Sequence, residues 1–127
     1  HGRFDDPRFA ELYRLVLRCQ ELGRRHARPG ITLAELNEIA WAPLIAAGFT
    51  RHHGLAHHIG LDVHDPADRN LPLAPGMLIS NEPGVYLPAE DIGIRIEDDL
   101  LITADGNENT TRMIPKRIAA LEAAMTA

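Results

Sequence analysis

The sequence predicts an α+β fold in one unit, residues 1–127. Two amphipathic helical segments come first, a glycine- and histidine-rich middle follows, and strand-like segments precede a short alanine-rich tail. The chain has 127 residues, of which 45% are hydrophobic, and this is enough for one core. No repeat, linker or low-complexity segment divides it, so we expect a single domain or part of one.

Two helices are predicted in the first 48 residues. The Asp6–Pro7 pair is typical of a helix start, and apolar residues recur at helical spacing from there to the turn at residues 28–30. Thr32 and Glu35 form a capping box for a second helix, which contains Pro43 and stops at Gly48. We interpret both helices as scaffold that covers the core.

Strands are predicted in the second half of the chain. Met77 to Asn81 form a strand that Pro83 and Gly84 interrupt, and residues 93–111 form two strands around a turn. In the first of these two strands, Ile94 and Ile96 face one way. The opposite face carries Arg95, Glu97 and Asp99. The tail, residues 115–125, is predicted to be helical.

Composition excludes several classes of partner. The formal net charge is −5 and no basic stripe is present, which argues against nucleic acid and acidic membranes. No apolar run is long enough to span a bilayer, and no signal peptide is visible. Cys19 is the single cysteine and excludes an internal disulfide, so we expect a reducing compartment, the cytoplasm.

The histidines and two glutamates indicate a metal site. Residues 52–65 hold five of the seven histidines, although histidines also occur on surfaces without a function. Glu82 precedes a Pro-Gly pair that keeps its backbone extended, and Glu97 lies among isoleucines and leucines, where an unpaired carboxylate is costly. A metal ion would account for both carboxylates, whereas a salt bridge to Arg95 would account only for Glu97. One imidazole with carboxylate oxygens suits Mn, Co, Fe or Zn.

Three motifs resemble one family. Residues 52–65, HHGLAHHIGLDVHD, resemble the histidine motif of the pita-bread metallopeptidases, which include aminopeptidase P, prolidase, creatinase and methionine aminopeptidase. LAPGMLISNEPGVYLP resembles the glutamate motif of that family and GIRIEDDLLIT its last motif, in the same order. DGNENTT is most similar to the aminopeptidase P branch, which removes an N-terminal residue that precedes proline. The resemblance implies the C-terminal part of a pita-bread fold, with helices packed on a curved antiparallel sheet.

The resemblance also implies roles for individual residues. His57 and Glu82 match ligands of one ion in a dinuclear centre, and Glu97 matches the carboxylate that bridges both ions. The counterpart of Glu82 also moves the proton of the attacking water. His53 and His64 match substrate-facing histidines that stabilise the tetrahedral intermediate, while His26, His52 and His58 match no role. Arg95 matches an arginine near the prolyl subsite.

The function implied is metal-assisted hydrolysis of an N-terminal Xaa-Pro bond. The expected cofactor is two divalent ions, most simply Mn²⁺, with Co²⁺, Zn²⁺ and Fe²⁺ as alternatives. The expected partner is a peptide with proline at its second position. Three alternatives stay open: an Xaa-Pro dipeptidase (prolidase), a creatinase-like C–N hydrolase, and a binding module that kept the fold without catalysis.

The resembled centre has two further ligands, both aspartates that precede the histidine motif by many tens of residues. Asp5 and Asp6 are adjacent at a predicted helix start, so they do not match that pair. We therefore expect both aspartates upstream of His1, and the N-terminal part of the catalytic domain to be absent from this chain. Alone, it should bind metal weakly or at one position, with little peptidase activity. An uncovered sheet edge would favour a homo-oligomer.

Overall fold

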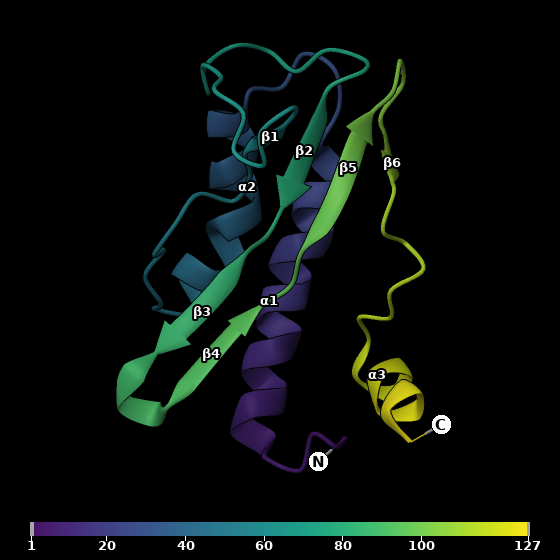
Figure 1. Ribbon diagram of the computed structural model, residues 1–127. Coiled ribbons are helices and arrows are strands. Elements are labelled where there is room, and N and C mark those ends of the chain that lie inside the picture. Colours follow the sequence, from purple (N-terminus) through teal and green to yellow (C-terminus); the bar gives the residue numbers. More distant parts are fainter. Residues whose placement is uncertain (1, 127) are drawn as a thin grey trace.

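The computed structural model describes residues 2–126 and contains three α-helices among them. Helix α1 (Pro7–His26) and helix α2 (Leu33–Ala46) pack against each other behind the strands, and α3 (Ile118–Met125) lies apart near the start of α1 (Figure 1). Among the described residues, no helix is long and apolar enough to cross a membrane.

The strands form two antiparallel sheets. The larger has the order β1-β2-β5-β6, formed by β1 (His58–Ile59), β2 (Leu78–Asn81), β5 (Asp98–Ile102) and β6 (Asn107–Asn109). The smaller pairs β3 (Gly84–Leu87) with β4 (Ile92–Arg95), joined by the 3-10 turn η1 (Pro88–Glu90). Figure 1 shows β3 and β4 extending β2 and β5 as one long hairpin. Antiparallel sheets with helices confirm the predicted α+β class.

Local signals set the helix ends as predicted. The Asp6 side chain accepts a hydrogen bond from the Arg8 N–H at the start of α1. Thr32 and Glu35 form the reciprocal capping box of α2, and Gly48 follows that helix with a φ of 85°, which favours glycine.

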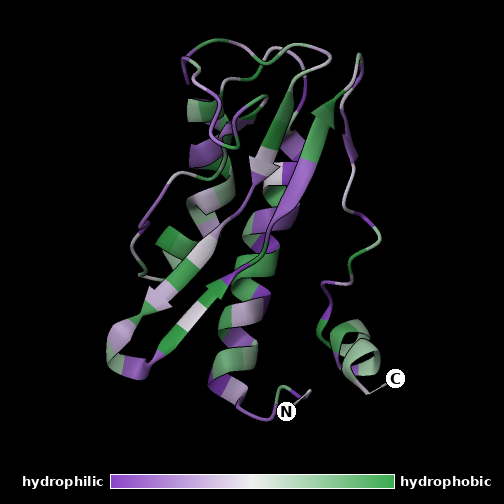
Figure 2. Cartoon of the chain, viewed as in Figure 1, coloured by the Kyte–Doolittle hydropathy of each residue, from purple (hydrophilic) through white to green (hydrophobic). Residues whose placement is uncertain are grey.

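The core lies between the two long helices and the hairpin. Ile94 and Ile96 share one face of the second arm, as predicted, and this face is buried. The alternation continues along the arm to Leu100 and Ile102, which are also buried. Asp98 occupies one of these core-facing positions and is also buried. Because β5 begins with Asp98, Figure 2 shows this strand as hydrophilic at its start and hydrophobic towards its end.

The structure corrects three details of the prediction. The first strand of residues 93–111 is divided into β4 and β5. A strand that was not predicted, β3, begins at Gly84, directly after Pro83. The last helix starts at Ile118 rather than at residue 115. The preceding segment instead runs along α1, where the Tyr13 hydroxyl donates to the Lys116 carbonyl at 2.7 Å.

Candidate metal centre

The candidate site is built at a break that interrupts both arms of the hairpin at the same level. Asn81 pairs with Asp98 on one side of the break and Gly84 with Arg95 on the other. The register is therefore the same on both sides, and Glu82 and Glu97 face each other across the gap. Pro83 has no N–H for a ladder bond, but its carbonyl accepts from the Ile96 N–H at 3.2 Å and keeps the arms together.

Three predicted ligands meet at this break. One candidate ligand atom from each of His57, Glu82 and Glu97 lies within 4.8 Å of the other two, and we call these three residues the ligand group. His57 lies in the loop directly before β1. Its Nε2 lies 3.1 Å from Glu82 Oε1. Both atoms can offer lone pairs, so a proton or a metal ion must lie between them.

The backbone fixes the His57 ring in the orientation that a ligand needs. Ser80 of β2 donates its hydroxyl to Glu82 and accepts from the His57 N–H at 3.0 Å. The ring Nδ1 lies 3.0 Å from the His58 carbonyl oxygen, which can only accept. Nδ1 therefore carries a hydrogen, and in the neutral ring Nε2 keeps its lone pair towards Glu82.

Glu82 is buried and Arg95 holds its second oxygen. Arg95 Nη1 lies 3.3 Å from Glu82 Oε2, and the Glu82 N–H donates to the Leu55 carbonyl at 2.8 Å. This contact corrects the alternative reading of the sequence, in which Arg95 formed a salt bridge with Glu97. Arg95 lies opposite Gly84, so Glu82 is its diagonal neighbour on the same face of the hairpin, within reach of the long Arg95 side chain.

Glu97 has a different environment from the one predicted. Its side chain is exposed on the outer face of the hairpin rather than enclosed by isoleucines and leucines. Partial desolvation raises the pKa of Glu97, and the negative charges of Glu82 and Asp99 raise it further. Two carboxylates facing each other at this distance favour a bound cation, which would reverse the repulsion. The donor set, one imidazole and two carboxylates, fits a divalent transition metal.

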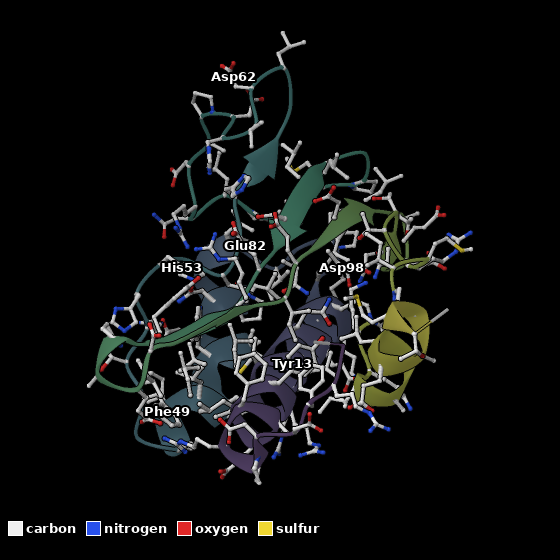
Figure 3. All side chains as sticks on the ribbon, turned by 60° about the horizontal axis from the view of Figure 1, so that its bottom comes forward. Tyr13, Phe49, His53, Asp62, Glu82 and Asp98 are labelled. Atoms are coloured by element: carbon white, nitrogen blue, oxygen red, sulfur yellow. The ribbon has the colours of Figure 1, made fainter. Side chains whose placement is uncertain are left out.

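Two further histidines lie beside the ligand group. The His64 ring centroid is 4.2 Å from that of His57, and His53 Nε2 lies 3.2 Å from the Tyr86 hydroxyl. His53, His57, His64, Glu82 and Arg95 line a pocket of about 280 Å³ together with Gly54, Ala56 and Arg69. Figure 3 shows Glu82 and His53 near each other, with Asp62 farther away at the tip of its loop. The structure thus gathers all six predicted site residues, although Glu97 lies at the break rather than in the pocket wall.

Two residues of the site, Tyr86 and Arg69, were not predicted from the sequence. Tyr86 of β3 accepts from Arg95 Nε at 2.7 Å and so links Arg95 with His53. The Arg69 guanidinium covers Gly54, where an added Cβ would lie 2.7 Å from its Nη1. Both residues are distant in sequence from their partners, so no local spacing could have identified them. Gly84 leaves room for Tyr86, because an added Cβ at Gly84 would lie 2.8 Å from the Tyr86 hydroxyl.

Comparison with known proteins gives one consistent result. The sequence pattern of metallopeptidase family M24 matches residues 1–104. The Xaa-Pro aminopeptidase of Escherichia coli (strain K12) is 35% identical over an alignment that covers 100% of this chain and 36% of that protein. The chain therefore spans about a third of the length of this curated relative.

Solved structures agree with this result. The proline aminopeptidase P II of Yersinia pestis superposes with a TM-score of 0.88 and 35% identity, over 99% of this chain and 36% of that one. The prolidase of Pyrococcus horikoshii OT3 gives a TM-score of 0.83 and 34% identity, over 89% of this chain and 34% of that one. These likenesses confirm the pita-bread fold that the motifs predicted.

Proposed function

Because the chain belongs to metallopeptidase family M24, we propose that it carries part of the catalytic centre of an Xaa-Pro aminopeptidase. The observation that supports this most directly is the ligand group, in which donor atoms of His57, Glu82 and Glu97 lie within 4.8 Å of one another. Membership of the family implies use of a divalent metal. Mn²⁺ is the proposed ion, because the set has more hard carboxylate oxygen than imidazole nitrogen.

The proposed centre is dinuclear, and this chain supplies part of it. Among residues 2–126, the ligand group is the one set of three such side chains close enough to hold an ion. The resemblance calls for two aspartate ligands as well, and Asp6 is engaged as the cap of α1. We therefore propose that the remaining ligands come from outside this sequence, and that the chain alone has little peptidase activity.

The bound ions would supply a water of lowered pKa and Lewis-acid polarisation of the scissile carbonyl. Glu82 is placed to take the proton of that water, because Ser80 and Arg95 hold its carboxylate in one orientation. In this proposal His64 donates a hydrogen bond to the oxygen that becomes negative in the transition state. His53 does so through Nε2 only when that nitrogen carries a hydrogen and leaves the Tyr86 hydroxyl, because its Nδ1 bonds to the Gly54 carbonyl. Glu82 can then pass its proton to the leaving proline nitrogen.

The proposed substrate is a peptide with proline in second position, with Arg95 beside the prolyl ring. Arg95 is kept near the pocket by the Tyr86 hydroxyl at 2.7 Å and stacks over the Tyr86 ring, with its Cζ 5.7 Å from the ring centroid. The prolidase likeness favours a second candidate, cleavage of Xaa-Pro dipeptides. Xaa-Pro dipeptides and Xaa-Pro-Yaa tripeptides, assayed with the complete protein that contains this chain, separate the two, and creatine serves as a control substrate.

The metal site can be tested on this chain by calorimetric titration with Mn²⁺. We expect binding of one ion, a large loss of affinity in His57→Ala, and unchanged affinity in His64→Ala, because His64 is proposed to face substrate. His58→Ala is the matched control, since it removes a neighbouring imidazole from outside the ligand group. Equal affinity in His57→Ala and the parent chain would overturn the ligand assignment. Loss of binding in His64→Ala would mean that His64 is itself a ligand.

A further inference from the structure

Three polar side chains are buried in the core directly behind the strand break. Gln20 of α1, Asn81 of β2 and Asp98 of β5 are 2%, 0% and 1% exposed, and we call them the buried polar cluster. Asn81 and Asp98 are direct partners in the β2–β5 ladder. Burying polar groups costs free energy unless they are well bonded, and apolar residues of similar size often serve a core as well or better. Stability alone therefore does not explain the cluster.

One helical residue is bonded to both strands. The Asn81 side-chain amide donates to the Gln20 carbonyl at 2.8 Å, and the Gln20 side-chain amide donates to the Asp98 carboxylate. Asp98 also accepts from Thr111 Oγ1 at 2.6 Å and pairs with Lys116 Nζ at 2.6 Å. Each strand is thus fixed to α1 by a directional bond.

Asn81 fits its place closely and at some cost. An added Cβ at Gly23 would lie 2.2 Å from Asn81 Oδ1, so only glycine in α1 leaves room for this side chain. Among the described residues, Oδ1 has no hydrogen-bond partner, and an unpaired buried acceptor is unfavourable. Asn81 is therefore better explained by its effect on the position of β2 than by a contribution to stability.

The cluster adjoins both carboxylates of the ligand group. Asn81 precedes Glu82 and Asp98 follows Glu97, and successive residues of a strand face opposite sides. The cross-strand pair Asn81–Asp98 therefore faces α1, while the next pair, Glu82–Glu97, faces the pocket side. The bonds of Asn81 and Asp98 to Gln20 of α1 agree with this arrangement.

We propose that Asn81 and Asp98 are positioning residues for the metal centre. Their bonds to Gln20 fix β2 and β5 where the ladder is interrupted, and so hold Glu82 and Glu97 at the separation that a divalent ion requires. The proposal rests on the metal site proposed above. Directional hydrogen bonds suit this task, because apolar packing alone tolerates small shifts of a strand that a metal centre does not.

The test compares metal affinity with stability in variants of this chain. Asn81→Leu keeps the size of the side chain and removes its bond to the Gln20 carbonyl. Gln20→Met keeps the size of that side chain and removes its bond to Asp98. We expect each to weaken Mn²⁺ binding roughly tenfold or more, as loss of an outer-shell partner commonly does, while circular dichroism shows a folded chain. Leu12→Ala is the matched control, because Leu12 is buried in the same helix two turns before Gln20.

The outcomes separate the two proposals. Weaker binding in both cluster variants, with parental affinity in an equally destabilised Leu12→Ala, supports the positioning role. Parental affinity in both cluster variants, or an equal loss in Leu12→Ala, overturns it and leaves the metal site intact. Failure of the parent chain to bind Mn²⁺, or equal binding by His57→Ala, overturns the metal site and the positioning role with it.

Discussion

At the scale of the residue, Glu97 carries a negative charge that its surroundings disfavour. Its partial desolvation and the nearby carboxylates of Glu82 and Asp99 raise its pKa, and Arg95 and His57 offset only part of this rise. Glu82, in contrast, contacts both Arg95 and His57 directly. Groups that serve a reaction or bind a ligand are often unfavourable for the folded state without that ligand. Glu97 fits this description, since its environment becomes favourable when a cation lies between it and Glu82.

The sign of this effect gives a prediction for Glu97→Gln. A carboxyl group with a raised pKa in the folded state binds its proton more tightly there, so metal-free stability falls as the pH rises above the ordinary Glu pKa. Glu97→Gln removes this loss. In EDTA at pH 7 we expect its free energy of unfolding to rise by less than about 1 kcal/mol, because the side chain is exposed and screened. At pH 4 the difference should vanish.

Urea unfolding at both pH values, followed by circular dichroism, measures the Glu97→Gln effect. Glu108→Gln is the matched control, because Glu108 accepts a 2.8 Å bond from Arg112 and loses a favourable pair when neutralised. Its stability should stay equal or fall at pH 7. A metal-free Glu97→Gln chain that is less stable than the parent at pH 7 would contradict the proposed repulsion.

At the scale of the element, α1 supports the hairpin where the strand pairing is interrupted. Strand pairing stops after Asn81 on one arm and before Asp98 on the other. The carboxylates of Glu82 and Glu97 therefore lie opposite each other in the gap between the two ladders. Helix α1 supports the ladder from behind through Gln20 and through the space at Gly23. A glycine inside a helix normally lowers stability, so its position against Asn81 explains why it is there.

Substitution of this glycine tests the fit between α1 and β2. Gly23→Ala would normally stabilise a helix by about 1 kcal/mol. Here the new Cβ would lie 2.2 Å from Asn81 Oδ1, so we expect a net loss of roughly 1–3 kcal/mol from overpacking. In an Asn81→Ala background the penalty should shrink or reverse, because the collision is gone. Thermal unfolding of the four chains of this double-mutant cycle measures the coupling; a higher Tm in Gly23→Ala alone would contradict it.

At the scale of the whole molecule, one core joins the helices to the hairpin that carries the ligand group. Cys19 reports on this core, because its side chain is 0% exposed between the helices and the sheet. Burial raises the pKa of its thiol to about 11. The thiolate is the reactive form, so the folded protein presents neither access nor the reactive ion to a thiol reagent at neutral pH.

We expect Cys19 modification to follow global unfolding. With an aromatic disulfide reagent at pH 8, labelling should be slow in buffer and increase with urea along the same curve as circular dichroism. Stability should also fall between about pH 9 and pH 11, because the unfolded thiol ionises in this range while the folded thiol does not. Cys19→Ser removes the labelling and is the control for reagent binding. Fast modification without urea would show that the core opens locally.

The sequence alone determined the features that depend on neighbouring residues. Helix starts at Asp6 and Thr32 and the helix end before Gly48 follow from hydrogen bonds and backbone angles within one turn. The burial of Ile94 and Ile96 follows from the two-residue period of a strand. The family and its pita-bread fold followed from three motifs, and the comparisons confirm both. The roles of the six site residues stay predictions.

Only the tertiary structure decided which side chains meet. Arg95 pairs with Glu82 rather than Glu97, and Tyr86 joins Arg95. Asp98, which reads in the sequence as one more acidic strand residue, is buried against Gln20. These contacts join residues far apart in the chain, and a one-residue change of register would reverse every side chain of a strand. Register depends on the packing of the whole core, so no local pattern contains it.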